Sequence, residues 1–228
     1  MKKGGINMKT LLSGMVIATI LLSACGSTTA AIDVTKASIP TSQALTVQPE
    51  IFGTMEMETS LAYEPTAQNL LNDATSVIKV KVTGLGDAQF VDGVGFSMEP
   101  QTPIEFELLD TVSGQTLASD AKIYASGGLV SLAEMVRALS AEQIAKMEID
   151  TLTPQQQAEQ FMLYRSDYDV ELTSGQTYLF LVTQQVNGDY SLLLNGYSVF
   201  TPNDATTFGS DITATNVLSQ EVYTFNHE

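Results

Sequence analysis

The sequence predicts a mainly β domain, a five-stranded barrel that carries a helical insertion. Residues 75–83 and 104–108 alternate apolar with charged side chains, which is typical of strands that bury one face. Between about 130 and 163 the apolar spacing changes to that of helices. Asn187-Gly188, flanked by strand-like sequence, predicts a tight hairpin near the end of the domain.

The first three strands are expected at residues 75–83, 104–108 and 121–125, and the third is expected to end at Gly127-Gly128. In the first two, apolar residues should face the core and charged residues the solvent. The apolar set is Ile78, Val80, Val82, Ile104, Phe106 and Leu108, and the charged set is Lys79, Lys81, Glu105 and Glu107. If these strands pair, lysines can lie opposite glutamates, each pair contributing about 0.2–1 kcal/mol. Independently solvated charges are the alternative.

The helical insertion is expected at about residues 130–163. Its apolar stripe has the spacing i, i+3, i+4, i+7 and comprises Leu132, Met135, Val136 and Leu139. Ser140 with Gln143 forms a capping-box pattern, and Thr153 followed by Pro154 marks another helix start. We expect the stripe to pack against the domain core, and a groove for a cofactor or partner is the alternative.

The fourth strand, residues 177–186, has an apolar centre on both faces, which places it in the middle of a sheet. The fifth is expected at 190–194. An extended segment at 168–172 and a weaker strand at 222–225 complete the pattern. Three strands, a helical insertion and a two-stranded hairpin are the element order of the OB barrel.

The start of the chain resembles the signal of a bacterial lipoprotein. Lys2, Lys3 and Lys9 precede an apolar run at 11–22, which leads through small residues to the sole cysteine. The residues that carry the resemblance are the lipobox-like Leu22, Ser23, Ala24 and Cys25. One alternative is a permanent membrane anchor, but a spanning helix needs about 20 apolar residues and this run is shorter. The other is a buried or free Cys25 thiol.

The lipobox resemblance implies that residues 1–24 are removed and that Cys25 becomes the first residue of the mature chain. It implies a diacylglyceryl group on the Cys25 sulfur and an acyl chain such as palmitate on its amino group, and two or more chains hold a protein stably on a bilayer. The implied location is the extracytoplasmic face of a bacterial cell membrane, with a signal and tether like those of Gram-positive lipoproteins. Residues 25–64 are expected to be the tether and 65–228 one globular domain, although 51–63 fits an edge strand or an irregular wrap.

Residues 65–202 resemble a group of small exported bacterial lipoproteins whose domain is similar to the OB-like netrin and tissue-inhibitor modules. The segments that carry this resemblance are 73–82, 104–111, 123–128, 174–181 and 195–200. The long helical stretch before the fourth strand departs from that pattern. The resemblance implies a fold and no particular activity.

Charge excludes one class of partner. Removing three signal lysines leaves seven basic residues against 26 acidic ones, a net charge near −19. Such a surface repels nucleic acids, so no nucleic-acid function is expected. Because Cys25 has no second cysteine to pair with, the core alone must stabilise the fold.

The sequence offers few residues for catalysis or metal binding. The sole histidine, His227, lies beside the C-terminus, where we expect it to fray, so a histidine-based triad and a zinc site are disfavoured. Asp167, Asp169 and Glu171 would project to one side of an extended segment and could bind Ca²⁺. A solvated edge that discourages aggregation is the favoured interpretation of these three, and no cofactor is expected.

The sequence therefore predicts a membrane-anchored binding or interaction module without catalysis. Its partners are the lipid bilayer, through acylated Cys25, and either a protein or an envelope glycan. One alternative is a carboxylate-dependent cell-envelope hydrolase, which a cleft with two acids and a raised pKa would favour. The other is a structural accessory subunit of an envelope complex, which a large exposed apolar patch would favour.

Overall fold

The computed structural model describes residues 49–58, 61–91, 99–203 and 209–227. Contacts group residues 37–228 into one compact unit, and the fold below is that of this unit alone. The predicted signal peptide, lipobox and lipidated Cys25, with most of the tether, lie outside the described residues. The unit is mainly β, as the sequence predicts.

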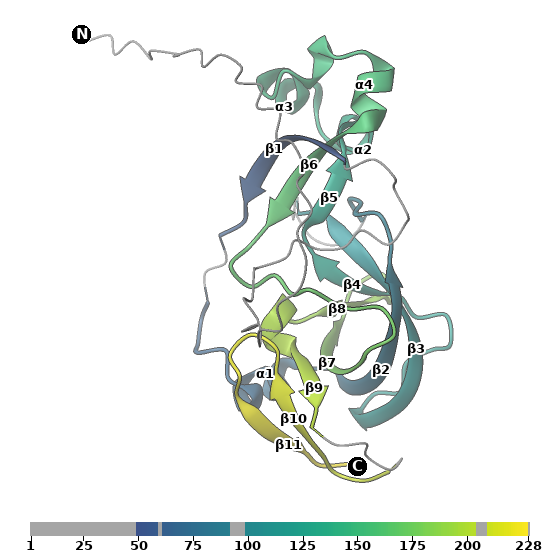
Figure 1. The fold of residues 1–228 in the computed structure, drawn as a ribbon, viewed down its shortest axis with the longest axis vertical. Helices are drawn as coiled ribbons and strands as arrows, with labels where there is room; N and C mark the ends of the chain where they lie inside the picture. The colour runs from purple at the N-terminus through teal and green to yellow at the C-terminus, as the bar shows by residue number, and fades with distance from the viewer. Residues whose placement is uncertain (1–48, 59–60, 92–98, 204–208, 228) are drawn as a thin grey trace, which may run out of the picture. The chain divides into compact units, whose positions relative to one another are not determined.

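Five strands form a closed barrel (Figure 1). They are β2 (Ser76–Leu85), β3 (Gln101–Gly114), β4 (Ile123–Ser126), β7 (Thr177–Gln184) and β8 (Tyr190–Leu192). Around the ring, β7 pairs with β2, β2 with β3, β3 with β4, β4 with β8, and β8 returns to β7. The first and fourth strands of the barrel, β2 and β7, pair with each other, and the third and fifth, β4 and β8, close the ring. This is the strand order of an OB barrel, so the predicted OB-like barrel is confirmed.

The barrel interior contains the alternating apolar residues of the first strand. Ile78, Val80 and Val82 are fully buried there, together with Phe180 of β7. The charged residues between them face the other way, and Lys81 lies opposite Glu107 on β3, as the alternation predicts. Register shifts in β2 and β3 place Lys79 opposite Asp110 instead, because bulges change which residues pair.

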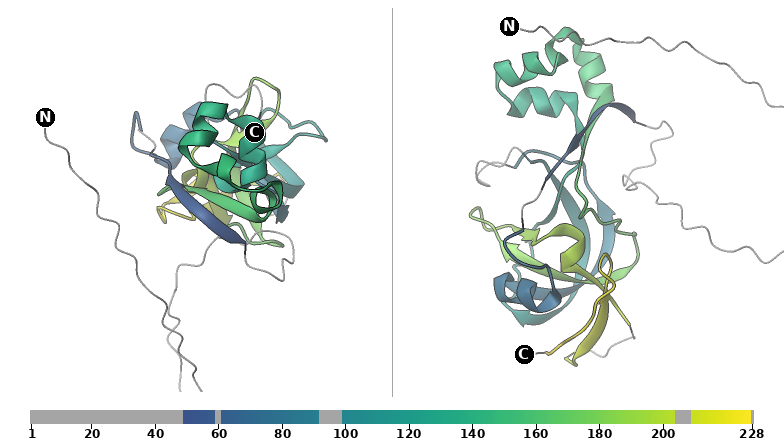
Figure 2. Two further views of the ribbon diagram at one scale, coloured as in Figure 1. Left: turned by 90° about the horizontal axis from the view of Figure 1, so that it is seen from above. Right: turned by 90° about the vertical axis from the view of Figure 1, so that its left-hand side faces the viewer.

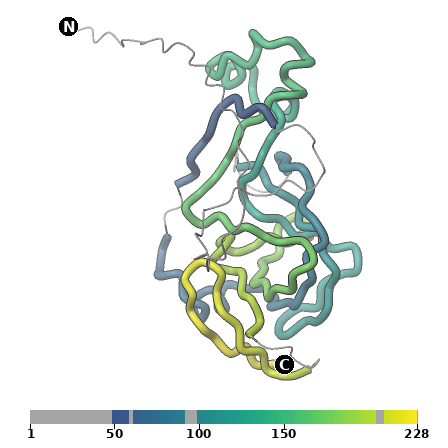
Figure 3. Tube along the Cα trace, in the orientation of Figure 1, coloured from purple at the N-terminus to yellow at the C-terminus, as the bar shows by residue number. Residues whose placement is uncertain are grey.

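The opposite face of β7 is also buried, which confirms its central position. Leu179 and Leu181 are fully buried in a second apolar cluster. That cluster is covered by α1 (Ala67–Asp73), η2 (Asn195–Ser198) and the strands β9 (Val199–Pro202), β10 (Ile212–Asn216) and β11 (Val222–Phe225). These three strands extend the barrel sheet beyond β7, and Figure 3 shows β10 and β11 at the end of the unit opposite the helical residues 132–159.

A second sheet has three strands and lies next to the helices (Figure 2). Its strands are β1 (Glu50–Glu56), β6 (Gln160–Arg165) and β5 (Gly128–Ser131), with β6 in the middle. The helices are α2 (Leu132–Ala138), α3 (Ala141–Lys146), η1 (Ile149–Thr151) and α4 (Pro154–Glu159). Leu132 and Met135 of the predicted stripe are fully buried against this sheet, and Leu139 packs against the same cluster. These three are core packing, whereas the expectation for Val136 is wrong, because its side chain is 40% exposed.

The helix-start signals are confirmed. The Ser140 hydroxyl accepts from the Gln143 backbone N–H, and the Gln143 side chain accepts from the Ser140 N–H, which completes a capping box. Thr153 caps α4 in the same way, with Pro154 as the first helical residue.

The structure differs from the sequence expectation at three boundaries. Residues 50–56 lie within the expected tether but form β1, which pairs in parallel with β6 about 110 positions away in the chain, so of the two alternatives for 51–63 the edge strand is present. The helices end at Glu159, so the last part of the expected insertion is strand β6. The expected extended segment at 168–172 begins instead in a turn. Pairing between distant segments leaves no local periodicity, which is why the sequence pattern missed the second sheet.

Paired glycines connect the barrel to the second sheet. Gly127 and Gly128 have φ values of 86° and 119°, in the region that favours glycine. A Cβ on Gly128 would collide with Thr102 Oγ1 and lie 3.0 Å from Ala88 Cβ. The chain can therefore leave β4 and enter β5 at this point only with a residue that lacks a side chain.

Gly128→Ala should lower the free energy of unfolding by more than about 3 kcal/mol, because it adds a steric clash to backbone strain. Gly188→Ala is the matched control, since Gly188 has φ 91° with nothing within 4 Å of an added Cβ; its cost should be about 1–2 kcal/mol. Urea unfolding followed by circular dichroism measures both losses. Equal losses in the two variants would contradict the close packing assigned to Gly128.

Candidate functional site

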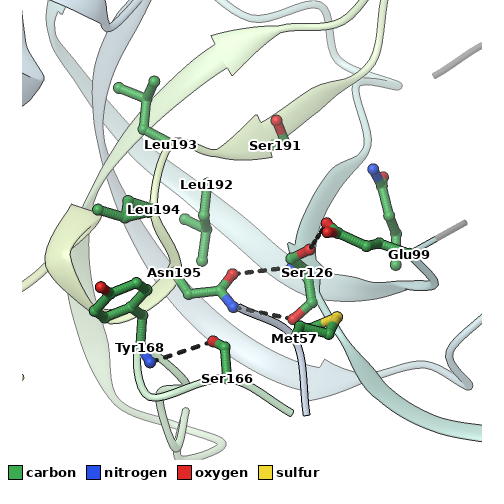
Figure 4. Close-up of a pocket in the computed structure, with 11 residues that line it drawn as sticks. Met57, Glu99, Ser126, Ser166, Tyr168, Ser191, Leu192, Leu193, Leu194 and Asn195 are labelled. Carbon is green, nitrogen blue, oxygen red and sulfur yellow. Dashed lines mark hydrogen bonds between the residues drawn. The ribbon is translucent and has the colours of Figure 1, made fainter. Parts of the chain in front are cut away.

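A polar cleft lies at the barrel rim where β4 ends (Figure 4). Its volume is ≈ 170 Å³. We call it the Asn195 cleft and define it by its polar lining residues Glu99, Gln101, Ser126, Ser166, Ser191 and Asn195. A second cavity of ≈ 30 Å³ shares Ser126 and Asn195 with it and adds Asp169. The two cavities therefore lie on either side of the same Asn195–Ser126 contact.

Asn195 is the residue around which the cleft is built. It has φ 38°, a left-handed conformation that asparagine adopts more readily than most residues, and it is 6% exposed. Its Oδ1 accepts from the Ser126 backbone N–H at 2.9 Å, and its Nδ2 donates to the Ser126 carbonyl at 3.0 Å. The side-chain amide thus pairs with Ser126 much as a neighbouring strand would.

The turn at residues 166–169 supplies the wall beside Asn195. The Gly196 N–H donates to the Tyr168 carbonyl at 2.8 Å, which ties the turn to η2. The Asp169 carboxylate accepts from the Ser166 hydroxyl at 3.1 Å and from Asn195 Nδ2 at 3.4 Å. Burial nevertheless raises the pKa of Asp169 above its ordinary value of 3.8, because desolvation outweighs these hydrogen bonds. Asp169 can therefore hold a proton more readily than an exposed aspartate.

The carboxylate that lines the Asn195 cleft is that of Glu99, whereas Asp169 lines the smaller second cavity. Glu99 accepts from the Ser126 hydroxyl at 3.3 Å. Asp169, Asn195, Ser126 and Glu99 therefore form one connected polar chain, through the Asn195 side chain and both the backbone and side chain of Ser126. The hydroxyls, the Asn195 amide and the Glu99 carboxylate in this arrangement can bind the polar groups of a ligand.

The structure places Asp167, Asp169 and Glu171, for which Ca²⁺ binding is the weaker alternative, in different surroundings. Asp169 turns inward at a bend in which its N–H donates to the Ser166 carbonyl, whereas Asp167 and Glu171 are exposed. The expected extended geometry, with all three carboxylates on one side, is therefore wrong. No group of three or more His, Cys, Asp or Glu side chains suited to a metal ion occurs among the described residues.

His227 is packed, and the expectation that it frays is wrong. Its side chain is 19% exposed, and Nε2 lies 3.4 Å from Oδ2 of Asp110, which is 7% exposed. Asp110 lies toward the opposite end of β3 from Gln101, so this pair is not part of the Asn195 cleft. The histidine anchors the end of the chain after β11.

Sequence reasoning missed Asn195 and Glu99 as site residues. Asn195 is the first residue of η2, and its positive φ is a property that only the structure shows. In the sequence nothing distinguishes Glu99 from other acidic residues, and only the fold shows that it lies beside Ser126.

Comparison with known proteins gives no relative. No family model matches the chain, and no curated protein or solved structure is significantly similar to it. The resemblance to exported lipoproteins with netrin-like domains therefore stays a prediction, while the five-stranded barrel itself is observed. Within the described residues, no helix is both long and apolar enough to cross a membrane.

Asp169→Asn should change the pH dependence of stability. A raised carboxyl pKa means that the folded state binds the proton more tightly than the unfolded state, so this group lowers stability as pH rises from 3.8 through the folded-state pKa. We therefore compare the free energy of unfolding of Asp169→Asn with that of the natural chain. The variant's value minus the natural chain's value should increase over that pH window and then level off.

Urea unfolding between about pH 3 and pH 7 measures this difference. Asp167→Asn, at an exposed carboxyl two residues earlier, is the control and should show a much smaller trend. A flat or falling difference for Asp169→Asn would contradict the assigned burial of this carboxylate.

Proposed function

We propose that the chain is an exported lipoprotein, anchored through acylated Cys25, whose barrel domain is a binding or interaction module that acts without catalysis. The observation that carries the binding role is the Asn195 cleft, a polar cavity on a rim that hydrogen bonds hold in place. The lipobox-like Leu22-Ser23-Ala24-Cys25 supports the anchor and the extracytoplasmic location. The acidic charge of the chain supports a partner other than nucleic acid.

The size and lining of the cleft limit its ligand. At ≈ 170 Å³ it is smaller than the roughly 300 Å³ at which pockets for drug-sized molecules begin. Its hydroxyls, amides and the Glu99 carboxylate suit a ligand group rich in hydrogen-bond donors. An envelope glycan that inserts one sugar unit, or a protein partner that inserts a polar side chain, fits this description.

Site-specific crosslinking on living cells tests the binding role. A photoreactive amino acid is placed at Ser191, in the cleft lining, and in a control chain at Val186, which is 95% exposed and outside the lining. We expect one reproducible product, protein or glycan, from Ser191 and none from Val186. The same products from both positions, or none from Ser191, would contradict a ligand site in the Asn195 cleft.

A carboxylate-dependent envelope hydrolase is a second candidate, favoured by Asp169 and Glu99. Burial raises the pKa of Asp169, as a general acid requires, and Glu99 is connected to it through Ser126 and Asn195. Purified chain should then release soluble fragments from envelope glycan, and Asp169→Asn should abolish the release. Activity that survives Asp169→Asn, or no release at all, would eliminate this candidate.

Cys25→Ala should abolish normal processing and attachment through acyl chains, because the alanine side chain has no sulfur to receive a diacylglyceryl group. Cell fractionation and immunoblotting should find this variant unprocessed or in the medium. Ser27→Ala, which leaves the lipobox-like residues intact, is the control and should remain with the membrane. Normal membrane retention of Cys25→Ala would contradict the anchor.

A further inference from the structure

The chain contains two Asn-Gly dipeptides, Asn187-Gly188 and Asn195-Gly196. Asparagine is chemically labile in this context, because the backbone nitrogen of the next residue can attack the carbon of the side-chain amide. Glycine favours the attack, since it has no Cβ to hinder the nitrogen and leaves the backbone free to turn. In the sequence the two dipeptides are equivalent, so the fold decides which of them can react.

The second dipeptide is held on both sides of the reacting bond. Asn195 is 6% exposed, and its amide oxygen and nitrogen are hydrogen-bonded to the Ser126 backbone at 2.9 and 3.0 Å. The Gly196 N–H, whose nitrogen would be the attacking atom, donates to the Tyr168 carbonyl at 2.8 Å. These contacts tie η2 to the end of β4 and to the turn at residues 166–169. Asn195 can therefore react only when that part of the fold opens.

The first dipeptide lies at the tip of the hairpin between β7 and β8. Val186, Asn187 and Gly188 are all exposed, and an added Cβ on Gly188 would have nothing within 4 Å. The Gly188 N–H donates to the Gln185 carbonyl at 3.0 Å, a contact inside the turn itself. Exposed turns of this kind open at little cost in free energy, because no distant segment has to move. The attacking nitrogen of Gly188 therefore becomes available without disturbing the barrel.

The two side-chain amides themselves have similar hydrogen bonds. Oδ1 of Asn187 accepts from the Asp189 N–H at 3.0 Å, and Oδ1 of Asn195 accepts from the Ser126 N–H at 2.9 Å. A backbone N–H at this oxygen stabilises the negative charge that develops on it when a nucleophile adds to the amide carbon. Because both amides are activated in this way, access of the glycine nitrogen is what separates the two sites.

We propose that Asn187 is a deamidation site of the folded protein, with water as the co-reactant and isoaspartate and aspartate as the products. The Gly188 nitrogen loses its proton to solvent and bonds to Cγ of Asn187, and the Cγ–Nδ2 bond breaks. The departing nitrogen takes up a proton and leaves as ammonia, so no oxidant or reductant is needed. Water then opens the succinimide ring. Hydrolysis of the Cγ–N bond gives aspartate, and hydrolysis at the backbone carbonyl carbon gives isoaspartate, in which the chain continues through Cγ.

Both products weaken the hairpin that carries β8. At present Nδ2 of Asn187 donates to the Asp189 carboxylate at 3.1 Å, and a carboxylate in its place removes this hydrogen bond and repels Asp189. Isoaspartate also adds an extra carbon atom to the backbone of the turn, which disturbs the register of β7 and β8. β8 has three residues, closes the barrel between β4 and β7, and carries Ser191 of the Asn195 cleft. Deamidation therefore loosens the barrel closure as the protein ages, whether or not the cleft holds a ligand.

Mass spectrometry of peptides from the aged full chain tests the site. The chain is kept in neutral buffer at physiological temperature and digested at intervals, and the amide, aspartate and isoaspartate forms are separated and quantified. We expect Asn187 to convert at least about tenfold faster than Asn195 in the folded chain, and the two to convert at similar rates in urea. An unconverted Asn187, equal rates in the folded chain, or a difference that persists in urea would overturn the proposal.

Hydrogen exchange tests the consequence for β8. The Tyr190 N–H, at the start of this strand, donates to the Lys122 carbonyl at 2.8 Å. Once Asn187 has converted, exchange of this amide should be about tenfold faster than in the fresh chain. Asn187→Gln is the matched control, because glutamine keeps an amide but closes a larger ring much more slowly, so its fresh and aged samples should exchange alike. Equal changes in both chains, or no change in the natural chain, would overturn the link between deamidation and the barrel closure.

Discussion

The contact on which the barrel and its cleft depend is the pairing of the Asn195 side chain with the backbone of Ser126. The ring closes through β4 and β8, which share two residue pairs, Ile123 with Tyr190 and Tyr124 with Ser191. Parallel pairing of this length is weak, and beyond it the end of β4 would have no neighbour on the side away from β3. The Asn195 amide supplies one donor and one acceptor at that position, so it extends the closure past the last strand pair.

The same contact positions the polar groups of the cleft. It fixes Ser126, whose hydroxyl reaches Glu99, and it holds Asp169, which accepts from the same amide. The hydrogen bonds of Asn195 in this network are part-buried, and such bonds are rigid when satisfied and costly when one member is removed. A cleft that is already ordered before a ligand arrives loses little conformational freedom on binding, which suits a binding module.

The sequence predicted the barrel well because its strands have local signatures. Ile78, Val80 and Val82 alternate with lysines, and Asn187-Gly188 marks the hairpin, so neither needed knowledge of the tertiary fold. Ser140 and Thr153 likewise marked helix starts through their own neighbours. In contrast, β1 and β6 pair across more than a hundred residues, and the strand sequence of β1 has no clean alternation.

The candidate site could be predicted only in part. The sequence favours a solvated edge for Asp167, Asp169 and Glu171, but the bend at Ser166 makes Asp169 a half-buried carboxylate beside Asn195. The role of Asn195 depends on a partner 69 residues earlier in the chain, which no local pattern encodes. His227 was expected to fray because it is near the C-terminus, and packing against Asp110 prevented it.

Hydrogen exchange at the Ser126 amide tests most directly whether Asn195 closes the barrel. The amide of Ser126 should exchange slowly in the natural chain, and Asn195→Ala should accelerate it by about tenfold or more, since a buried hydrogen bond is lost. The amide of Val80, in the middle of β2, should change much less. Rapid exchange at Ser126 in the natural chain, or an unchanged rate in Asn195→Ala, would contradict the account.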